Sequence, residues 1–159
     1  PAAMLDEAAL TPLVWQAIAA WESAGLDAAR VATLQSVWFE IADLPGNYLG
    51  WATPDRIVLD LDAAGYGWNV GKDEGQRTRD GTSGLSFAAG GVNSGSRPST
   101  LDPRLSMDLL TAVMHEMGHV LGLADLDEED ELMGDVLQPG TRHLPTMADI
   151  DRVLAGGNW

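Results

Sequence analysis

Residues 106–133 read SMDLLTAVMHEMGHVLGLADLDEEDELM, and the two histidines at the centre, His115 and His119, are four positions apart. Positions with this spacing lie one above the other on the same face of a helix, so both imidazoles can reach a single metal ion. Glu116 is rotated by about 100° around the helix axis from His115, beside the histidine pair rather than within it. This position predicts a general base that acts on a water molecule held by the metal.

The residues after the second histidine supply a candidate third ligand. Gly122 follows His119 by three positions, where glycine can end a helix through a left-handed turn. Such a turn sends the chain back toward the metal and brings Asp125 within reach. Two histidines and one carboxylate leave a coordination position for water, which is typical of catalytic rather than structural zinc sites.

With Met133 eight residues after Asp125, the segment resembles the metzincin zinc peptidases, whose signature is H-E-x-x-H-x-x-G-x-x-H/D followed by a methionine-containing turn. The positions of Leu132-Met133 and Leu144-Pro145 are similar to those in the matrixin-like branch. An aspartate in place of the third histidine is similar to the snapalysin-type metzincins. The resemblance implies an α+β, zincin-like fold with a twisted mixed β-sheet of about four to five strands, a backing helix, an active-site helix and a C-terminal helix.

The resemblance also implies roles for further residues. Met133 is expected to pack beneath the metal without ligating it. An apolar pocket for a substrate side chain is expected from Val136, Leu137 and Leu144. Met133 is followed by Gly134 and Asp135, so the tyrosine that some metzincins place two residues after this methionine is missing.

The function implied by the resemblance is zinc-dependent endopeptidase activity on proteins or peptides, by a monomer that is secreted and of bacterial origin. Zn²⁺ is the expected cofactor, and a zinc-bound water deprotonated by Glu116 is expected to attack the scissile carbonyl. A second hypothesis is a metal-binding or adhesive module that keeps the site without turning over substrate.

Other catalytic classes lack residues that they require. Gluzincins take their third ligand from a glutamate on a later helix, and no glutamate follows Glu131. Aspzincins use G-T-x-D-x-x-Y-G, of which only Gly140-Thr141 is present. Neither the segment 81–84 nor the segment 91–95 matches a nucleophile elbow or a phosphate-binding loop. The remaining histidine, His143, is expected at the surface.

Composition narrows the class of protein further. A chain of 159 residues predicts a single domain, residues 1–159, here a catalytic domain that a larger secreted protein could contain. The net charge of −15 argues against nucleic acids and anionic membranes as partners. The chain has no cysteine, so we expect neither a disulfide nor a thiolate nucleophile. It has no apolar run of about 20 residues, so we expect no membrane span. No basic residue precedes Arg30, so we expect no signal peptide in this chain.

Periodicity and turn residues predict the other elements. A helix is expected over 11–25, with Trp15 and Trp21 in the core rather than on a ligand platform. Strands are expected over 31–41, 48–52, 57–61 and 85–89, the last within an irregular, glycine-rich stretch from Gly65 to Arg104. The active-site helix is expected to begin at Ser106 or Asp108. Its predicted apolar face contains Leu109, Leu110, Val113, Met117 and Leu121.

A final helix is expected over 147–154, capped by Thr146 and with Ile150, Val153 and Leu154 inward. The segment Gly65-Tyr66-Gly67-Trp68 is interpreted as a turn packed by aromatic rings rather than as a carbohydrate platform.

Calcium is a second candidate metal. Asp60 and Asp62 could hold it, although a solvated strand end is the simpler interpretation. The acidic loop 125–131 does not fit an EF-hand, which would need glycine at Asp130 and glutamate at Val136. We interpret it as a solvated loop with Asp125 turned inward.

Overall fold

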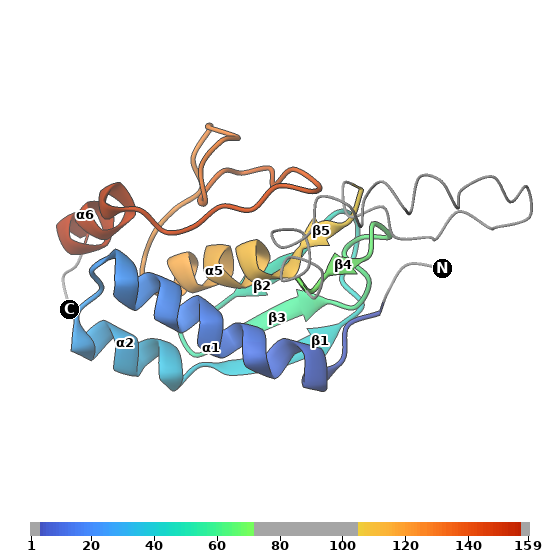
Figure 1. The fold of residues 1–159 in the computed structure, drawn as a ribbon, viewed down its shortest axis with the longest axis horizontal. Helices are drawn as coiled ribbons and strands as arrows, with labels where there is room; N and C mark the ends of the chain where they lie inside the picture. The colour runs from blue at the N-terminus through green and yellow to red at the C-terminus, as the bar shows by residue number, and fades with distance from the viewer. Residues whose placement is uncertain (1–3, 72–104, 157–159) are drawn as a thin grey trace, which may run out of the picture.

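The computed structural model describes residues 4–71 and 105–156, which form a mixed α+β fold with four helices and two small sheets (Figure 1). The helices are α1 (Glu7–Ala24), α2 (Ala28–Gln35), α5 (Leu109–Val120) and α6 (Met147–Gly156). The strands are β1 (Trp38–Ala42), β2 (Gly50–Ala52), β3 (Arg56–Asp60), β4 (Trp68–Asn69) and β5 (Met107–Asp108). The strand expected over 85–89 and most of the glycine-rich stretch lie outside the described residues.

The five described strands form two sheets where one sheet of four to five strands was expected. The larger sheet has the order β1-β3-β2, with β1 parallel and β2 antiparallel to β3. β4 and β5 form a separate parallel pair, and β5 leads directly into α5. Among the described strands, β2 has β3 as its single neighbour, so it forms one edge of the described sheet, beside α5.

Helix α1 ends where the sequence predicts and begins earlier. Gly25, with φ of 118°, directs its amide to the carbonyls of Glu22 and Trp21, as expected for a glycine at the end of a helix. At the other end, the Asp6 carboxylate accepts a hydrogen bond of 2.7 Å from the Ala9 amide. This cap places Pro12 inside the helix, so the predicted start at residue 11 is wrong.

The strand predicted over 31–41 is correct for its second half alone. Residues 28–35 form helix α2, whose Asp27 cap accepts from the Arg30 amide at 3.1 Å and forms an ion pair with the Arg30 guanidinium. These local bonds favour a helix in a segment whose β-branched residues, Val31 and Thr33, indicated a strand.

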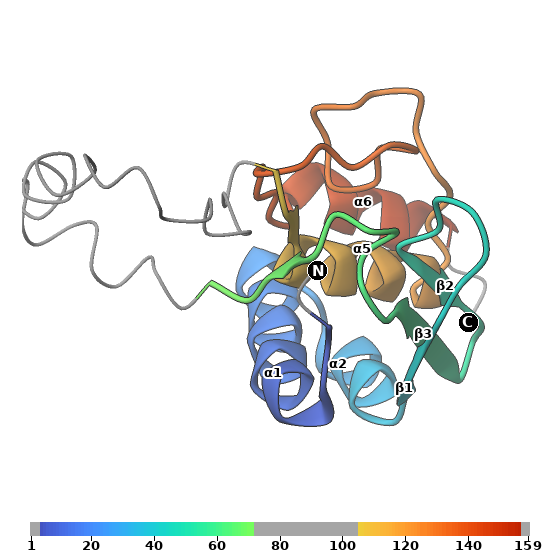
Figure 2. The ribbon, with the colours of Figure 1, turned by 90° about the vertical axis from the view of Figure 1, so that its right-hand side faces the viewer.

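Helix α5 lies at the centre of the molecule, between α1 and the three-stranded sheet (Figure 2). All five residues of its predicted apolar face are buried, which confirms that prediction. Trp21 on α1 is fully buried and donates its indole N–H to the Met114 carbonyl at 3.2 Å, tying α1 to α5. Trp15 is 59% exposed, so its predicted place in the core is wrong.

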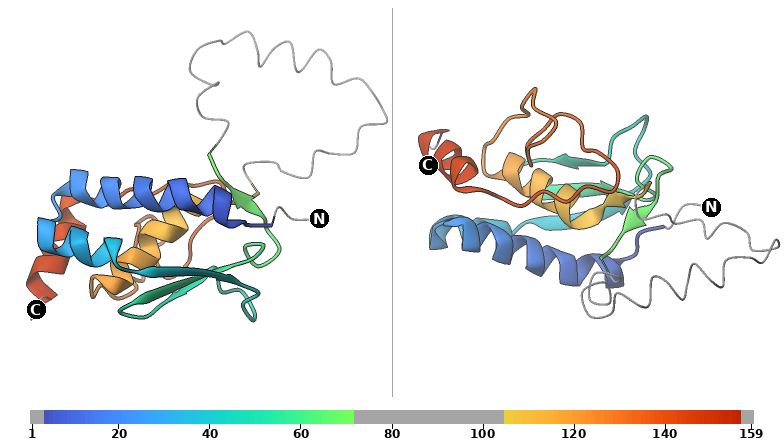
Figure 3. Two further views of the ribbon diagram at one scale, coloured as in Figure 1. Left: turned by 90° about the horizontal axis from the view of Figure 1, so that it is seen from below. Right: turned by 45° about the horizontal axis from the view of Figure 1, so that its top comes forward.

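The segment that joins α5 to α6 lies on the side of α5 opposite α1 and α2 (Figures 1 and 3). The predicted cap of α6 is confirmed, since Thr146 and Asp149 exchange side-chain and backbone hydrogen bonds of 2.7 and 3.3 Å. Ile150 and Val153 are buried as predicted, but Leu154 is exposed. No helix among residues 4–71 and 105–156 is long and apolar enough to cross a membrane.

Asp60 at the end of β3 is buried, which corrects the interpretation of a solvated strand end. Its carboxylate accepts hydrogen bonds from the amides of Leu44 and Ala64, both 2.7 Å, and of Asp62, 3.2 Å. Burial alone would raise the pKa of Asp60, but these hydrogen bonds lower it below the usual value. Trp68 donates to the Asp60 carbonyl at 2.8 Å, so the predicted aromatic-packed turn is confirmed for Trp68, whereas Tyr66 is exposed.

Candidate metal centre

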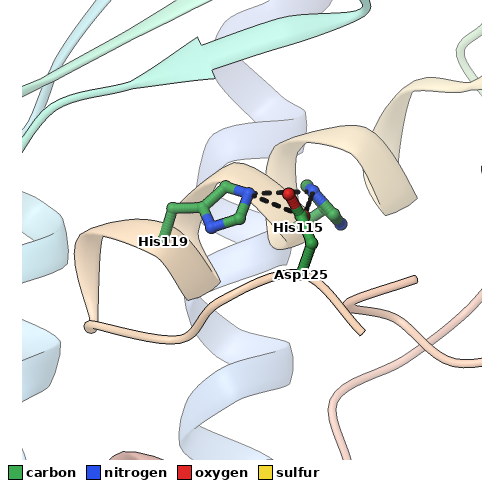
Figure 4. A group of neighbouring side chains, drawn as sticks. All are labelled: His115, His119 and Asp125. Atoms are coloured by element: carbon green, nitrogen blue, oxygen red, sulfur yellow. Dashed lines mark hydrogen bonds and ion pairs between the residues drawn. The ribbon is translucent and has the colours of Figure 1, made fainter. Parts of the chain in front are cut away.

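His115 and His119 lie one turn apart on α5 and face the same point, as their spacing predicts. Their rings meet edge to face with centroids 4.7 Å apart, and their Nε2 atoms are 3.0 Å apart. The Asp125 Oδ1 atom lies 3.3 Å from each Nε2 (Figure 4). Among the residues that the structure describes, these three are the one group of His, Cys, Asp or Glu side chains that could hold a metal ion.

The other ring nitrogens determine where the protons lie. His115 Nδ1 is 2.8 Å from the Leu132 carbonyl oxygen, and His119 Nδ1 is 2.9 Å from the Leu123 carbonyl oxygen. A carbonyl can only accept, so each Nδ1 is the donor, and in a neutral ring the Nε2 atom then carries a lone pair. Two lone pairs and a carboxylate oxygen therefore converge on one point, an arrangement that a cation would stabilise.

The distances between these atoms fit a small metal ion. A tetrahedral zinc ion with bonds of about 2.1 Å keeps its ligand atoms about 3.4 Å apart. The observed separations of 3.0 and 3.3 Å are close to that value. The residues present therefore fit the metal that the sequence led us to expect.

The turn at Gly122 carries the chain from α5 to Asp125. Gly122 has φ of 92°, and the Leu123 amide donates back to the Gly118 carbonyl at 2.9 Å, which closes the last turn of the helix. This turn directs the Leu123 carbonyl at His119 and continues to Asp125. Asp125 aims its carboxylate at the histidines, although its side chain is 53% exposed rather than fully turned inward.

Met133 lies fully buried beneath the histidine turn of α5. A Cβ atom at Gly118 would overlap the Met133 sulfur, so glycine at this position lets the methionine approach the helix backbone. Hydrogen bonds of 2.7 Å from the Leu126 amide to the Met133 carbonyl and 2.9 Å from the Asp135 amide to the Leu126 carbonyl close the intervening loop. The loop that contains Asp125 is thus fixed to the segment that supports His115.

Glu116 is 7% exposed and lines the same cleft as the two histidines. Burial, and to a smaller extent the negative charge of Asp125, raises the pKa of Glu116 to about 8. Burial also lowers the pKa of His115, which favours the neutral imidazole that a metal ligand requires.

The cleft above these residues has a volume of about 540 Å³. Strand β2 and the preceding Tyr48 form part of its lining, and Val136 and Leu137 contribute to it as well. Leu144, the third expected pocket residue, is exposed and is not among the lining residues. The sequence did not indicate that β2 lines the cleft, because pairing between distant strands leaves no local pattern.

His143 is half buried rather than at the surface, and its Nε2 atom is buried without a hydrogen-bond partner among the residues that the structure describes. Its backbone amide donates to the Thr111 hydroxyl at 3.1 Å, which fastens the segment before α6 to α5. His143 contributes no atom to the metal-binding group.

In comparisons with known proteins, no family model matches this chain, and no curated protein matches it closely enough to count as a relative. Support for a function therefore comes from the residues of the site and their geometry.

Proposed function

We propose that this protein is a zinc-dependent endopeptidase of the metzincin type, with zinc held by His115, His119 and Asp125. One observation carries the proposal: two imidazole Nε2 atoms and one carboxylate oxygen converge within 3.0 to 3.3 Å of one another, and the buried Glu116 lines the same cleft. Three ligands leave a coordination position free, which distinguishes catalytic from structural zinc sites.

The donor atoms favour zinc over calcium. Calcium takes six to eight oxygen ligands, whereas two imidazoles and one carboxylate suit zinc and related transition metals. When bound, zinc supplies two effects, a lower pKa for a coordinated water and polarisation of a carbonyl oxygen.

Glu116 is the proposed general base. Its position beside His115 lets its carboxylate accept a proton from the attacking water, whose oxygen forms the new bond to the scissile carbonyl carbon. As the bond between that carbon and the amide nitrogen breaks, Glu116 returns the proton to the leaving amine. A cation nearby favours the carboxylate form of Glu116 and so offsets the effect of burial on its pKa.

Strand β2 is the proposed docking edge for substrate. It is antiparallel to β3, lines the cleft, and has no second neighbour among the described strands. An extended peptide can bind such an edge through backbone hydrogen bonds, while side-chain pockets provide selectivity. Val136 and Leu137, which also line the cleft, offer apolar surface for a substrate side chain.

Denatured casein provides a direct test of peptidase activity. The zinc-loaded protein should cleave it, a chelator should stop cleavage, and added zinc should restore it. One bound zinc per chain without cleavage of casein or of a mixed peptide library would refute the peptidase and support the non-catalytic metal-binding module.

A further inference from the structure

Strand β2 approaches Glu116 so closely that a side chain would not fit between them. A Cβ atom built at Gly50 would lie 2.6 Å from Glu116 Oε1 and 2.8 Å from both Cδ and Cγ. All three distances are shorter than a carbon atom tolerates, and all three involve the Glu116 side chain rather than backbone. Gly50 and Glu116 are 66 positions apart in the sequence, so no local pattern reports this contact.

The backbone of Gly50 does not itself require glycine. Gly50 is the first residue of β2, pairs with Leu59 of β3, and is not among the residues with positive φ. An alanine at this position can therefore keep the strand conformation. The conflict lies entirely between the new methyl group and the Glu116 side chain.

Glu116 can make room for such a methyl group only by turning its side chain. That side chain is buried where α5 contacts β2, with the cleft beside it, whereas His115 is held by its hydrogen bond to the Leu132 carbonyl. A methyl group on Gly50 would therefore displace the carboxylate along the cleft and leave the two histidines in place.

We propose that Gly50 is a positioning residue for Glu116: its missing side chain lets β2 lie against the glutamate and hold the carboxylate on the side of α5 that faces the cleft. The consequence for catalysis rests on the proposed peptidase function, whereas the contact between the two residues does not.

The contact is tested without metal or substrate by a double-mutant cycle on the chelated full chain, measured by urea unfolding. Gly50→Ala should lower the unfolding midpoint when Glu116 is present. In the Glu116→Ala background the same change should leave the midpoint unchanged or raise it, because the methyl group then enters vacated space. Equal losses in both backgrounds would overturn the proposal.

The positioning role is tested by steady-state kinetics of zinc-loaded Gly50→Ala. We expect kcat to fall by about 10²-fold, the order expected for a misplacement of about 1 Å, with KM within about twofold and zinc content unchanged. Gly156→Ala is the matched control, because a Cβ atom at Gly156 would meet no described residue within 4 Å. A raised KM with unchanged kcat would overturn the positioning role and assign Gly50 to substrate docking.

The two failures are distinguishable. A wild-type protein without peptidase activity would refute the proposed function, and the unfolding cycle would still decide whether Gly50 positions Glu116.

Discussion

Replacing Glu116 by glutamine is expected to stabilise the metal-free protein, and to do so increasingly as the pH rises from about 4.5 to about 8. Burial, followed by the charge of Asp125, raises the pKa of Glu116 from 4.5 to about 8. Between these values the folded chain holds a proton that the unfolded chain has released, so stability falls with rising pH. Glutamine has a similar shape and no proton to lose, and therefore avoids this loss.

The magnitude follows from the difference between the two pKa values. At 1.36 kcal/mol per pH unit above 4.5, the free energy of unfolding of wild type falls by about 3 kcal/mol at pH 7 and by at most about 5 kcal/mol above pH 8. Water that enters the cleft when Glu116 ionises would reduce both values. Well below pH 4.5, Glu116 is protonated in both the folded and the unfolded chain. The difference in free energy of unfolding between wild type and Glu116→Gln should then no longer change with pH.

Urea unfolding in the presence of a chelator, at several pH values between 4.5 and 8.5, measures this difference. Glu22→Gln, which changes an exposed carboxylate on α1, is the control and should follow wild type. Saturating zinc should shrink the gap, because a cation nearby favours the ionised Glu116. Parallel curves for wild type and Glu116→Gln across this range would refute the reasoning.

Three further predictions follow from other contacts. Asp125→Ala should weaken zinc binding by at least about 10-fold, because losing a ligand costs more affinity than losing a hydrogen bond that supports a ligand. Asp125→His should retain zinc. A metal titration in which Asp127→Ala weakens zinc binding and Asp125→Ala does not would identify a different third ligand. Gly118→Ala should lower the free energy of unfolding by about 1–3 kcal/mol because its methyl group would overlap the Met133 sulfur. A thermal unfolding midpoint of the variant equal to that of wild type would contradict this packing. Asp60→Ala should lower the free energy of unfolding by about 1–3 kcal/mol or more, because it leaves three backbone amides unpaired. Because the pKa of Asp60 is lowered, the stability that its carboxylate provides should be present above pH 3.8 and lost as the pH falls further. A free energy of unfolding equal to that of wild type at pH 7 would exclude this role.

The parts of the candidate site that sequence could predict are those decided within a few residues. The spacing of His115 and His119 on a helix, the left-handed turn at Gly122 and the cap at Asp108 depend on local backbone geometry. The Asp108 carboxylate accepts from the Thr111 amide at 3.1 Å, at the predicted start of α5. Asp125 follows Gly122 by three residues and lies 3.3 Å from the Nε2 atom of each histidine.

The parts that sequence could not predict depend on distant partners. The sequence predicts a strand over 31–35, within helix α2, because Val31 and Thr33 favour extended chain, and the competing Asp27 cap is worth only about 1 kcal/mol. Trp15 has the spacing of a core residue on α1, but the width of the buried stripe depends on which elements cover it. The contact of Gly50 with Glu116 requires the order of strands in the sheet, which no local pattern encodes.

The most direct test compares wild type with Glu116→Gln in a single-turnover peptide cleavage assay, with zinc content measured in the same samples. We predict about one zinc per chain in both proteins, and a cleavage rate at least about 10²–10⁴-fold lower in the variant, because a positioned base contributes that much to the rate. Equal cleavage rates at equal zinc content would contradict the assignment of Glu116 as the base and, with it, the proposed mechanism.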